Sequence, residues 1–261
     1  MPSRLESLLA LFGIDPAKMA QSTCALRWFI RDYRTFKSAH VESGSDFEFG
    51  KLYPCLDDRS EQSGSASGGY FHGDLLVARR VFDRQPIRHA DIGSRIDGFV
   101  AHVAAFRQID VFDIRPLQSE VTNIHFKQID LTKGVDANLV NHYDSVSCLH
   151  ALEHFGLGRY GDDLDYHGYR KGFQAISKIV APGGTFYLSV PMGPQRIEFN
   201  AHRVFSISYL RQMCEPLYKI ARFSYVDDDG GLFEDVAFDS PAASRNYNCH
   251  YGLAIFELIK K

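Results

Sequence analysis

Short apolar runs alternate with longer amphipathic segments from about residue 87 to residue 261. The short runs are rich in Val, Ile, Phe and Tyr and end close to Gly, Asp or Pro, as β-strands do. Strands that alternate with helices in this way are typical of a parallel sheet with helices on both faces. We therefore expect a Rossmann-like α/β domain with seven strands, at 87–93, 109–114, 123–129, 143–149, 185–191, 219–226 and 251–259.

Three amphipathic segments between these strands are predicted to be helices. The first follows the strand that ends near Gly93, the second covers 169–184, and the third covers 206–217. Pro182 and the glycines behind it are expected to stop the second helix, because proline cannot continue the hydrogen-bonding pattern. The apolar face of the first helix is predicted from Phe99, Val100, Val103, Ala104 and Phe106.

The N-terminal part of the chain has a different pattern. Residues 1–40 are predicted to be helical, and 61–69, EQSGSASGG, are predicted to form a flexible loop. We divide the chain into a helical extension with this loop, 1–69, and an α/β domain, 70–261. The residues after the loop are expected either to cover a ligand or to dock the N-terminal helices: Tyr70, Phe71, His72 and Asp74. In the N-terminal extension, the apolar positions of the predicted helix are Leu5, Leu8, Leu9 and Phe12.

Composition narrows the range of partners. The net charge of −3 leaves no basic face for many phosphates, so nucleic acid is not an expected partner. Five cysteines without C-x-x-C spacing suggest reduced thiols and a cytoplasmic location. No apolar run is long enough to predict a membrane span. Composition does not distinguish a monomer from a homo-oligomer.

One short motif raises the question of a metal. His150, Glu153 and His154 form H-x-x-E-H, a spacing by which a helix can present two histidines to zinc. The following segment, GLGRYGDD at 156–163, contains three glycines, which disfavour a long helix. We therefore expect no metal here. Two other interpretations are a histidine pair in a surface loop and a segment at the ligand-binding edge of the sheet.

Acidic residues at three successive strand ends favour the ligand-binding interpretation. Asp91 and Gly93 lie at the first strand-to-helix turn, where a glycine lets backbone approach a ligand closely. Asp113 ends the second strand, where a carboxylate can accept hydrogen bonds from two ribose hydroxyls. Asp130 ends the third strand, from which an adenine edge can be reached.

These segments resemble the class I S-adenosylmethionine-dependent methyltransferases. Among them, residues 70–261 are most similar to a bacterial family of unknown function found among surface-polysaccharide genes. The resemblance rests on DIGSRIDG at 91–98, VFDIRPL at 111–117, KQIDLT at 127–132, YDSVSCLHALEH at 143–154 and APGGTFYLSVP at 181–191. It implies S-adenosylmethionine as cofactor, bound by Asp91, Gly93, Ser94, Arg95, Asp113, Ile114, Asp130, Leu131, Cys148 and Leu149.

The glycine-rich turn departs from the usual pattern of that superfamily. Arg95 and Asp97 stand where second and third glycines are expected. Arg95 would either crowd the cofactor or bind its carboxylate through paired hydrogen bonds. The G-x-G-x-x-G fingerprint of a dinucleotide-binding dehydrogenase is also interrupted, and no second domain remains for a hydride acceptor.

The resemblance implies methyl transfer, and we expect O-methylation of a small-molecule or saccharide acceptor. A hydroxyl acceptor must lose its proton, and histidine is the side chain most readily adapted to accept it. The candidate catalytic residues are His150, Glu153, His154 and His202, with Glu153 orienting one of the imidazoles. The alternative is a non-catalytic, cofactor-binding or scaffolding protein of the same fold.

Overall fold

The computed structural model describes residue 9, residues 12–43 and residues 47–261. The chain divides into two compact units, 1–65 and 66–261. Of the apolar positions predicted for a helix in the N-terminal extension, Leu5 and Leu8 lie outside the described residues.

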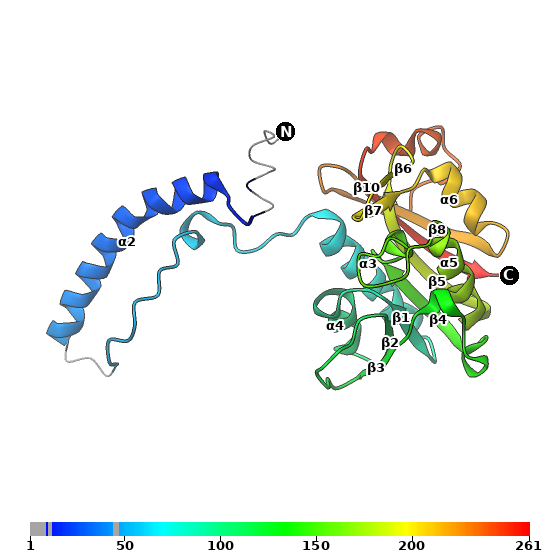
Figure 1. The fold of residues 1–261 in the computed structure, drawn as a ribbon, viewed down its shortest axis with the longest axis horizontal. Coiled ribbons are helices and arrows are strands. Elements are labelled where there is room, and N and C mark those ends of the chain that lie inside the picture. The colour runs from blue at the N-terminus through cyan, green and yellow to red at the C-terminus, as the bar shows by residue number, and fades with distance from the viewer. Residues whose placement is uncertain (1–8, 10–11, 44–46) are drawn as a thin grey trace. The chain divides into compact units, whose positions relative to one another are not determined.

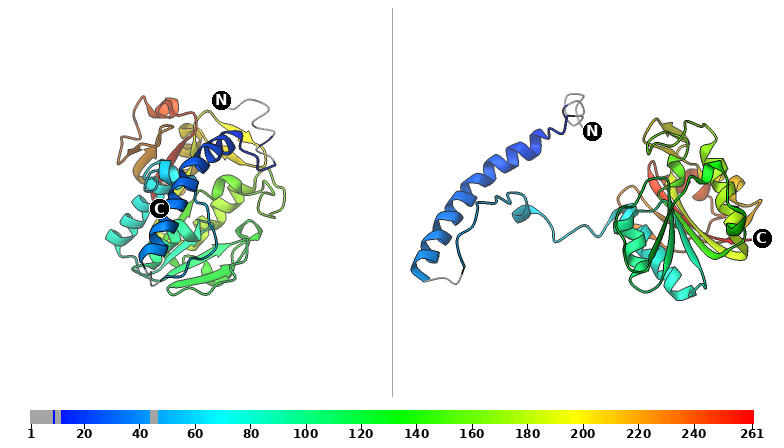
Figure 2. Two further views of the ribbon diagram at one scale, coloured as in Figure 1. Left: turned by 90° about the vertical axis from the view of Figure 1, so that its left-hand side faces the viewer. Right: turned by 60° about the horizontal axis from the view of Figure 1, so that its bottom comes forward.

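Unit 1–65 is built on one long helix, α2 (Pro16–Ser43), followed by an irregular segment that runs back along it (Figures 1 and 2). The Phe49 ring packs against Tyr33 and His40, with ring centroids 5.7 and 5.0 Å apart. The Arg59 guanidinium lies 4.6 Å from the centre of the Trp28 ring. Aromatic and ionic contacts therefore hold this unit together, and Ala25 alone is buried among its described residues.

The second unit is organised around one sheet of eight strands in the order β3-β2-β1-β4-β5-β10-β8-β9. Strands β1 to β5 are parallel, whereas β10 is antiparallel to both of its neighbours. The predicted α/β architecture is confirmed. The strands are β1 His89–Ile92, β2 Ile109–Asp113, β3 Ile124–Gln128, β4 Tyr143–Leu149, β5 Val180–Met192, β8 Tyr218–Val226, β9 Leu232–Phe233 and β10 Gly252–Lys260.

The sheet differs from the prediction of seven strands by the edge strand β9. This strand has two residues, which is too short to show alternation in the sequence. It is held by pairing with the end of β8 and by stacking of Phe233 on Tyr225, whose ring centroids are 4.7 Å apart. A separate hairpin of β6 (Arg196–Glu198) and β7 (His202–Val204) follows β5 and was also not predicted.

Helices cover both faces of the sheet (Figure 1). Helix α3 (Gly68–Arg84), a π-helical turn (Ile96–Val100) and α4 (Ala101–Ala104) pack on one face. Helices α5 (Gly168–Ile179) and α6 (Ile207–Cys214) pack on the other. Helix α5 ends before the predicted stop, because residues 180–184 already belong to β5.

Helix α3 gives residues 70–74 a place in the packed domain. The predicted loop ends at Ser67, whose extended backbone precedes the first turn of α3. Asp74 is buried and Tyr70 is half-exposed. These residues therefore belong to a helix packed on the sheet, rather than to a separate lid.

The register of the parallel strands brings several strand ends to the same edge of the sheet. Asp91 of β1 lies opposite Val111 of β2 and Ser147 of β4. The carboxyl ends of β1, β2 and β4 therefore open together, and the turns that follow them can share one ligand.

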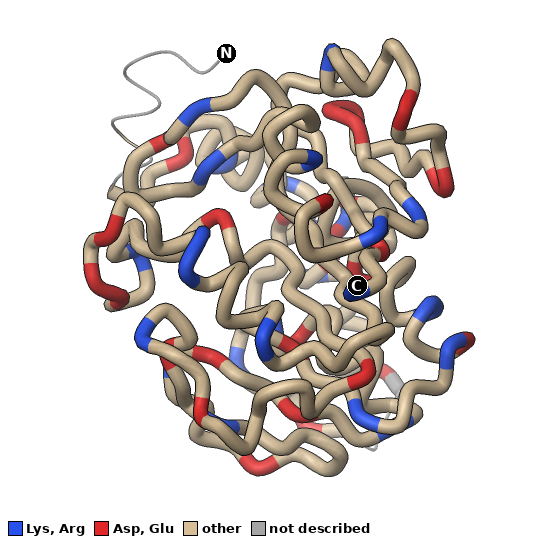
Figure 3. Tube along the Cα trace, turned by 90° about the vertical axis from the view of Figure 1, so that its right-hand side faces the viewer, with Lys and Arg blue, Asp and Glu red and all other residues tan. Residues whose placement is uncertain are grey.

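Charged residues of both signs are interspersed along this unit, as Figure 3 shows. No helix among the described residues is long and apolar enough to cross a membrane.

Candidate ligand site

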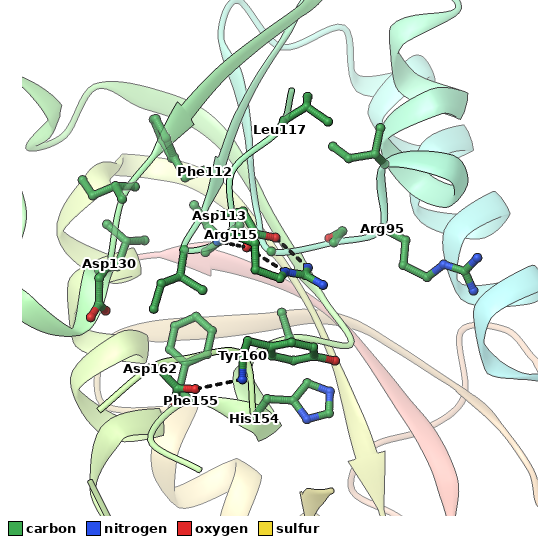
Figure 4. A pocket seen from close by; sticks show the side chains of 18 of the residues that line it. Arg95, Phe112, Asp113, Arg115, Leu117, Asp130, His154, Phe155, Tyr160 and Asp162 are labelled. Carbon is green, nitrogen blue, oxygen red and sulfur yellow. Dashed lines mark hydrogen bonds and ion pairs between the residues drawn. The ribbon is translucent and has the colours of Figure 1, made fainter. Parts of the chain in front are cut away.

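A pocket of about 530 Å³ lies at the carboxyl edge of the sheet (Figure 4). Its walls come from the turns after β1 to β4, from the first turn of α3 and from the loop after the H-x-x-E-H segment. The predicted residues that line it are Gly93, Ser94, Arg95, Asp113, Ile114, Asp130, Leu131, His150 and His154. Tyr70, which was expected to cover a ligand or to dock the N-terminal helices, also lines it, and residues that line it without having been predicted include Phe112, Arg115, Ile129, Phe155, Tyr160 and Asp162.

The turn after β1 is fixed by a buried carboxylate. Asp91 accepts hydrogen bonds from Ser94 N at 3.0 Å, from Ser94 Oγ at 2.6 Å and from Ser147 Oγ at 2.6 Å. Burial outweighs these bonds and raises the pKa of Asp91 to about 6. Asp91 does not line the pocket. The prediction of direct cofactor contact is therefore corrected: this side chain supports the turn from beneath.

Gly93 and Ser94 shape the floor of the pocket. Gly93 has φ of +71°, and a Cβ there would lie 3.0 Å from the Cβ of Ala151. Ser94 Oγ accepts a hydrogen bond from Leu149 N at 3.1 Å, which ties the turn to the end of β4. A side chain at position 93 would be strained and would press on the segment after β4.

Arg95 pairs with Asp97. Its Nε lies 3.0 Å from Asp97 Oδ1 and its Nη2 lies 2.7 Å from Oδ2. The guanidinium points away from the centre of the pocket (Figure 4) and lies 5.3 Å from the centre of the Tyr70 ring. In this arrangement Arg95 neither fills the pocket nor offers a free fork to a carboxylate.

The glycine-rich pattern expects a glycine at position 97, where this chain has Asp97, and Gly98 follows one residue later. A Cβ on Gly98 would lie 2.4 Å from Asp74 Oδ2, so α3 can approach this turn only at a glycine. Burial, with the nearby Asp91 carboxylate, raises the pKa of Asp74 to about 7. Asp74 was not expected to support this turn, because α3 itself was not predicted.

Asp113 lies at the end of β2 and is paired with Arg115. Its Oδ1 accepts from the backbone N of Arg115 at 2.8 Å and from Nε at 3.1 Å, and Oδ2 accepts from Nη2 at 2.8 Å. The Arg115 guanidinium also lies 4.5 Å from the centre of the Tyr160 ring, on the loop after β4 (Figure 4).

Asp130 caps a short helical turn with one oxygen and leaves the other free of hydrogen bonds. Oδ1 accepts from Thr132 N at 2.9 Å and from Thr132 Oγ1 at 2.6 Å. Oδ2 is buried, and no hydrogen-bond donor among the described residues reaches it, although Lys133 Nζ lies 3.6 Å away. Leu131 and Ile129 line the pocket beside it, so this end combines apolar walls with one available acceptor.

Cys148 and Leu149 are fully buried in the sheet and do not line the pocket. They were predicted to contact the cofactor. The correction follows from strand burial: β4 is covered on both faces, so the chain becomes accessible only at His150, where it leaves the sheet.

The H-x-x-E-H segment forms a single 3-10 turn, Leu152–His154, rather than a longer helix. Its two histidines have different partners. His150 has φ of +53° and its ring stacks on Tyr70, with centroids 4.1 Å apart. Within the described parts of the chain, no group of three or more His, Cys, Asp or Glu side chains could hold a metal ion.

His154 lies against the pocket with its tautomer set by the backbone. Its Nδ1 is 2.7 Å from the carbonyl oxygen of Ala201, so in the neutral ring Nδ1 carries the proton. Its Nε2 is 3.7 Å from Glu153 Oε1. Burial lowers the pKa values of His150 and His154 to about 4 each. Both rings are therefore neutral near pH 7.

Glu153 is buried behind His154 and does not line the pocket. Burial raises its pKa to about 8, and the described residues supply no hydrogen-bond partner for its Oε2. The Ala201 carbonyl orients His154, so the prediction that Glu153 sets the tautomer is corrected.

His202 lies in β7 and outside the pocket lining. Its Nε2 is 2.9 Å from Glu198 Oε2, and its Nδ1 is 3.4 Å from the Tyr251 hydroxyl. The structure therefore does not bring this fourth catalytic candidate to the pocket together with His150 and His154.

Arg203 holds the loop that forms one wall of the pocket. This buried side chain donates to the carbonyl oxygens of Glu153, Phe155 and Tyr166, at 3.2, 2.7 and 3.3 Å. Its guanidinium lies 4.8 Å from the centre of the Tyr169 ring. Arg203 directly follows His202 in the sequence, where no signal shows that it binds backbone carbonyls.

Comparison with solved structures shows the same fold. The 1,6-didemethyltoxoflavin-N1-methyltransferase of Burkholderia thailandensis, solved with its substrate and S-adenosylhomocysteine, has a TM-score of 0.53 and 12% identity, covering 90% of each chain. The [4+2]-cyclase SpnF has a TM-score of 0.51 and 15% identity, covering 72% of this chain and 81% of that one. At these identities the similarity establishes the fold alone, and the cyclase shows that the fold is not restricted to proteins named as methyltransferases.

A third structure, phosphoethanolamine N-methyltransferase 2 of Haemonchus contortus, has a TM-score of 0.50 and 12% identity, covering 78% of this chain and 56% of that one. None of the curated proteins matches this sequence. The family model described as "Caenorhabditis protein of unknown function, DUF268" matches residues 109–241.

Proposed function

The chain belongs to the DUF268 family, whose description states no activity, and we propose that its α/β unit is an S-adenosylmethionine-dependent methyltransferase. The observation that carries this proposal is one pocket lined from three successive strand ends, by Gly93, Asp113 and Asp130. A glycine turn and two carboxylates in this order suit the methionine, ribose and adenine parts of the cofactor. The shared fold supports the proposal.

The residues present fit this cofactor at its adenine end. Asp130 Oδ2 is a buried acceptor with no hydrogen-bond donor among the described residues, although it pairs with Lys133 Nζ at 3.6 Å, and an adenine amino group can donate to it. Ile129 and Leu131 provide apolar contacts for a planar ring. Gly93 leaves space on the floor that a Cβ would take. The bound cofactor would supply a methyl group on a sulfonium, which is already a good electrophile.

We propose that the acceptor is a hydroxyl group on a small molecule or saccharide. A neutral amine can attack through its lone pair, whereas a hydroxyl must lose its proton to a base, and the neutral imidazole of His154 is placed to accept such a proton. Tyr70, 48% exposed at the pocket, stacks on His150 and presents the rest of its ring as an apolar contact for such an acceptor.

Within this proposal, His154 accepts the hydroxyl proton at Nε2, since its Nδ1 is committed to the Ala201 carbonyl. Above the raised Glu153 pKa of about 8, the resulting imidazolium is stabilised by the Glu153 carboxylate, whose Oε1 lies 3.7 Å from Nε2. His150 then packs against Tyr70 and shapes the acceptor side of the pocket.

A second candidate function is cofactor binding without catalysis. It is favoured by Glu153, because an acid whose pKa is raised to about 8 is mainly protonated at pH 7 and supplies no carboxylate to stabilise a His154 imidazolium. Turnover with a hydroxyl acceptor separates this candidate from the first, whereas binding alone does not.

The experiment that tests the proposal is calorimetry with S-adenosylhomocysteine. We expect saturable binding that Asp113→Ala weakens by about 1.5–3 kcal/mol, as for a hydrogen bond to a charged group. Asp136→Ala is the matched control, since this exposed carboxylate pairs with Lys127 and does not line the pocket. Absence of binding to the wild-type protein, or equal affinities of wild type and Asp113→Ala, would contradict the assignment.

A further inference from the structure

The Asp113–Arg115 pair lies within the pocket and connects its two sides. Arg115 engages the carboxylate at the end of β2 through Nε and Nη2 and packs on Tyr160, at 4.5 Å. Tyr160 in turn meets the edge of the His154 ring, with centroids 5.3 Å apart. A continuous line of contacts therefore runs from β2 to the loop after β4, and both ends line the same pocket.

The Arg115 guanidinium and the two hydroxyls of a ribose compete for the same lone pairs of the Asp113 carboxylate. An ionised carboxylate offers about four lone-pair sites. On Asp113, the backbone N and Nε of Arg115 occupy Oδ1, and Nη2 occupies one site of Oδ2. About one site remains, whereas two adjacent hydroxyls require two. At least one guanidinium bond must therefore break before a ribose diol can bind Asp113 through both hydroxyls.

We propose that Arg115 is a clasp that lowers the affinity of the pocket for nucleosides with a free ribose diol, and that it must leave Asp113 for such a ligand to bind. This inference rests on the proposed function, since it assumes a nucleoside-bearing ligand. Arg115 is free to move, because its side chain is 48% exposed and, apart from Asp113, it packs on the face of Tyr160. The backbone N of Arg115 continues to orient Asp113 when the side chain leaves.

If Arg115 acts as this clasp, its removal should strengthen ligand binding. Removing an arginine at a ligand pocket ordinarily weakens binding, but Arg115→Met should bind S-adenosylhomocysteine about two- to fivefold more tightly, the range expected when an exposed ion pair no longer has to be broken. Methionine keeps a side chain of similar length against Tyr160. The control is Arg159→Met, because Arg159 also lies over Tyr160, at 5.2 Å, but donates to the Ala201 carbonyl and makes no bond to Asp113.

Ligands that differ only in the diol complete the experiment. Calorimetry is run on the wild type and both variants with S-adenosylhomocysteine, adenosine and 2′,3′-dideoxyadenosine, after thermal melts show that all three are folded. The gain from Arg115→Met should appear with the first two ligands and vanish with the dideoxy nucleoside. An equal or weaker affinity in Arg115→Met, or an equal gain for the dideoxy nucleoside, overturns the clasp and leaves the proposed function standing. Failure of every protein to bind S-adenosylhomocysteine and adenosine overturns both.

Discussion

Glu153 is a buried acid beside His154. Whether Glu153 is ionised should decide whether it can stabilise a positively charged His154 ring. Because burial raises its pKa to about 8, Glu153 is mainly protonated at pH 7 and cannot stabilise a developing imidazolium. As the pH rises through about 8, the carboxylate forms and catalysis should improve. An imidazole titration near pH 6.5 is not expected, since burial lowers the pKa of His154 to about 4.

We predict that kcat/KM of the wild type for a hydroxyl acceptor rises between pH 7 and 9, and that Glu153→Gln is slower by about 10- to 100-fold above pH 8 and lacks this rise. Initial rates with labelled cofactor across this range provide the measurement. The control is Glu198→Gln, which removes an exposed carboxylate beside His202 and should leave the profile unchanged. A rise that persists in Glu153→Gln would assign the titration to another group.

Gly93 is a second position where a single residue is critical, because its backbone conformation and its close contact with Ala151 shape the floor of the pocket. Gly93→Ala places a Cβ at φ of +71° and 3.0 Å from Ala151. We expect a loss of about 1–3 kcal/mol in the free energy of unfolding, as for other residues held in a sparsely populated backbone region. Denaturant unfolding measures it, and Gly183→Ala, which has a similar φ of +73° but open space around it, separates the backbone strain from the contact. Equal losses in the two variants would show that the contact with Ala151 is unimportant.

At the scale of elements, the loop from Phe155 to Tyr166 depends on one buried cation. Arg203→Met removes the donors of three backbone carbonyls, and we expect about 2–4 kcal/mol of lost stability together with weaker ligand binding. Urea unfolding and calorimetry test both effects. Arg222→Met, at an exposed arginine on β8, should stay within about 0.5 kcal/mol of the wild type. Unchanged ligand affinity in a destabilised Arg203→Met would show that the loop is not a binding wall.

The elements that could be predicted from sequence are those with their own periodicity. Strands β1 to β5, β8 and β10 follow apolar runs bounded by turn residues, and α5 and α6 follow amphipathic spacing. Helix α3 was missed because it begins directly after a Gly- and Ser-rich loop and exposes Phe71, Leu75 and Phe82. The hairpin of β6 and β7 was missed because strands of three residues show no alternation.

Site residues could be predicted from sequence where the position of a residue relative to a strand end is enough to place it at the pocket. Asp113 ends β2 and Asp130 follows β3 by two residues, and both line the pocket, whereas Asp91 is turned inward by hydrogen bonds and Glu153 is buried, which no spacing reveals. Arg115 follows Asp113 by two residues, but a sequence does not show that its guanidinium folds back onto that carboxylate.

For the whole molecule, several buried acids predict that stability falls as the pH rises. Burial raises the pKa values of Asp74 and Glu153 to about 7 and 8, so between pH 6.5 and 8.5 the folded protein binds more protons than the unfolded chain. The buried His150 and His154, with pKa values near 4, act in the opposite direction, but only below about pH 6.5, where unfolded histidine gains its proton.

We therefore expect the free energy of unfolding to decrease from pH 6.5 to 8.5, and to keep decreasing above this window, because unfolded thiols ionise while burial raises the pKa values of Cys148, Cys214 and Cys249. Urea titrations at several pH values in this window test it. Asp74→Asn and Glu153→Gln should each flatten the decrease, and an exposed substitution such as Asp163→Asn should not. A wild-type stability that rises over this window would contradict the raised pKa values of both acids.

The position of β10 also has a consequence for synthesis of the protein. Strand β10 lies between β5 and β8 and is hydrogen-bonded to both, so these two strands cannot be joined until Gly252–Lys260, which follows them in the chain, has been made. During translation, β5 and β8 each present an unpaired edge, and such edges are templates for pairing with other chains. Strand β10 therefore closes the sheet late in synthesis, and a nascent chain arrested before Gly252 should depend more on chaperones than one that includes β10.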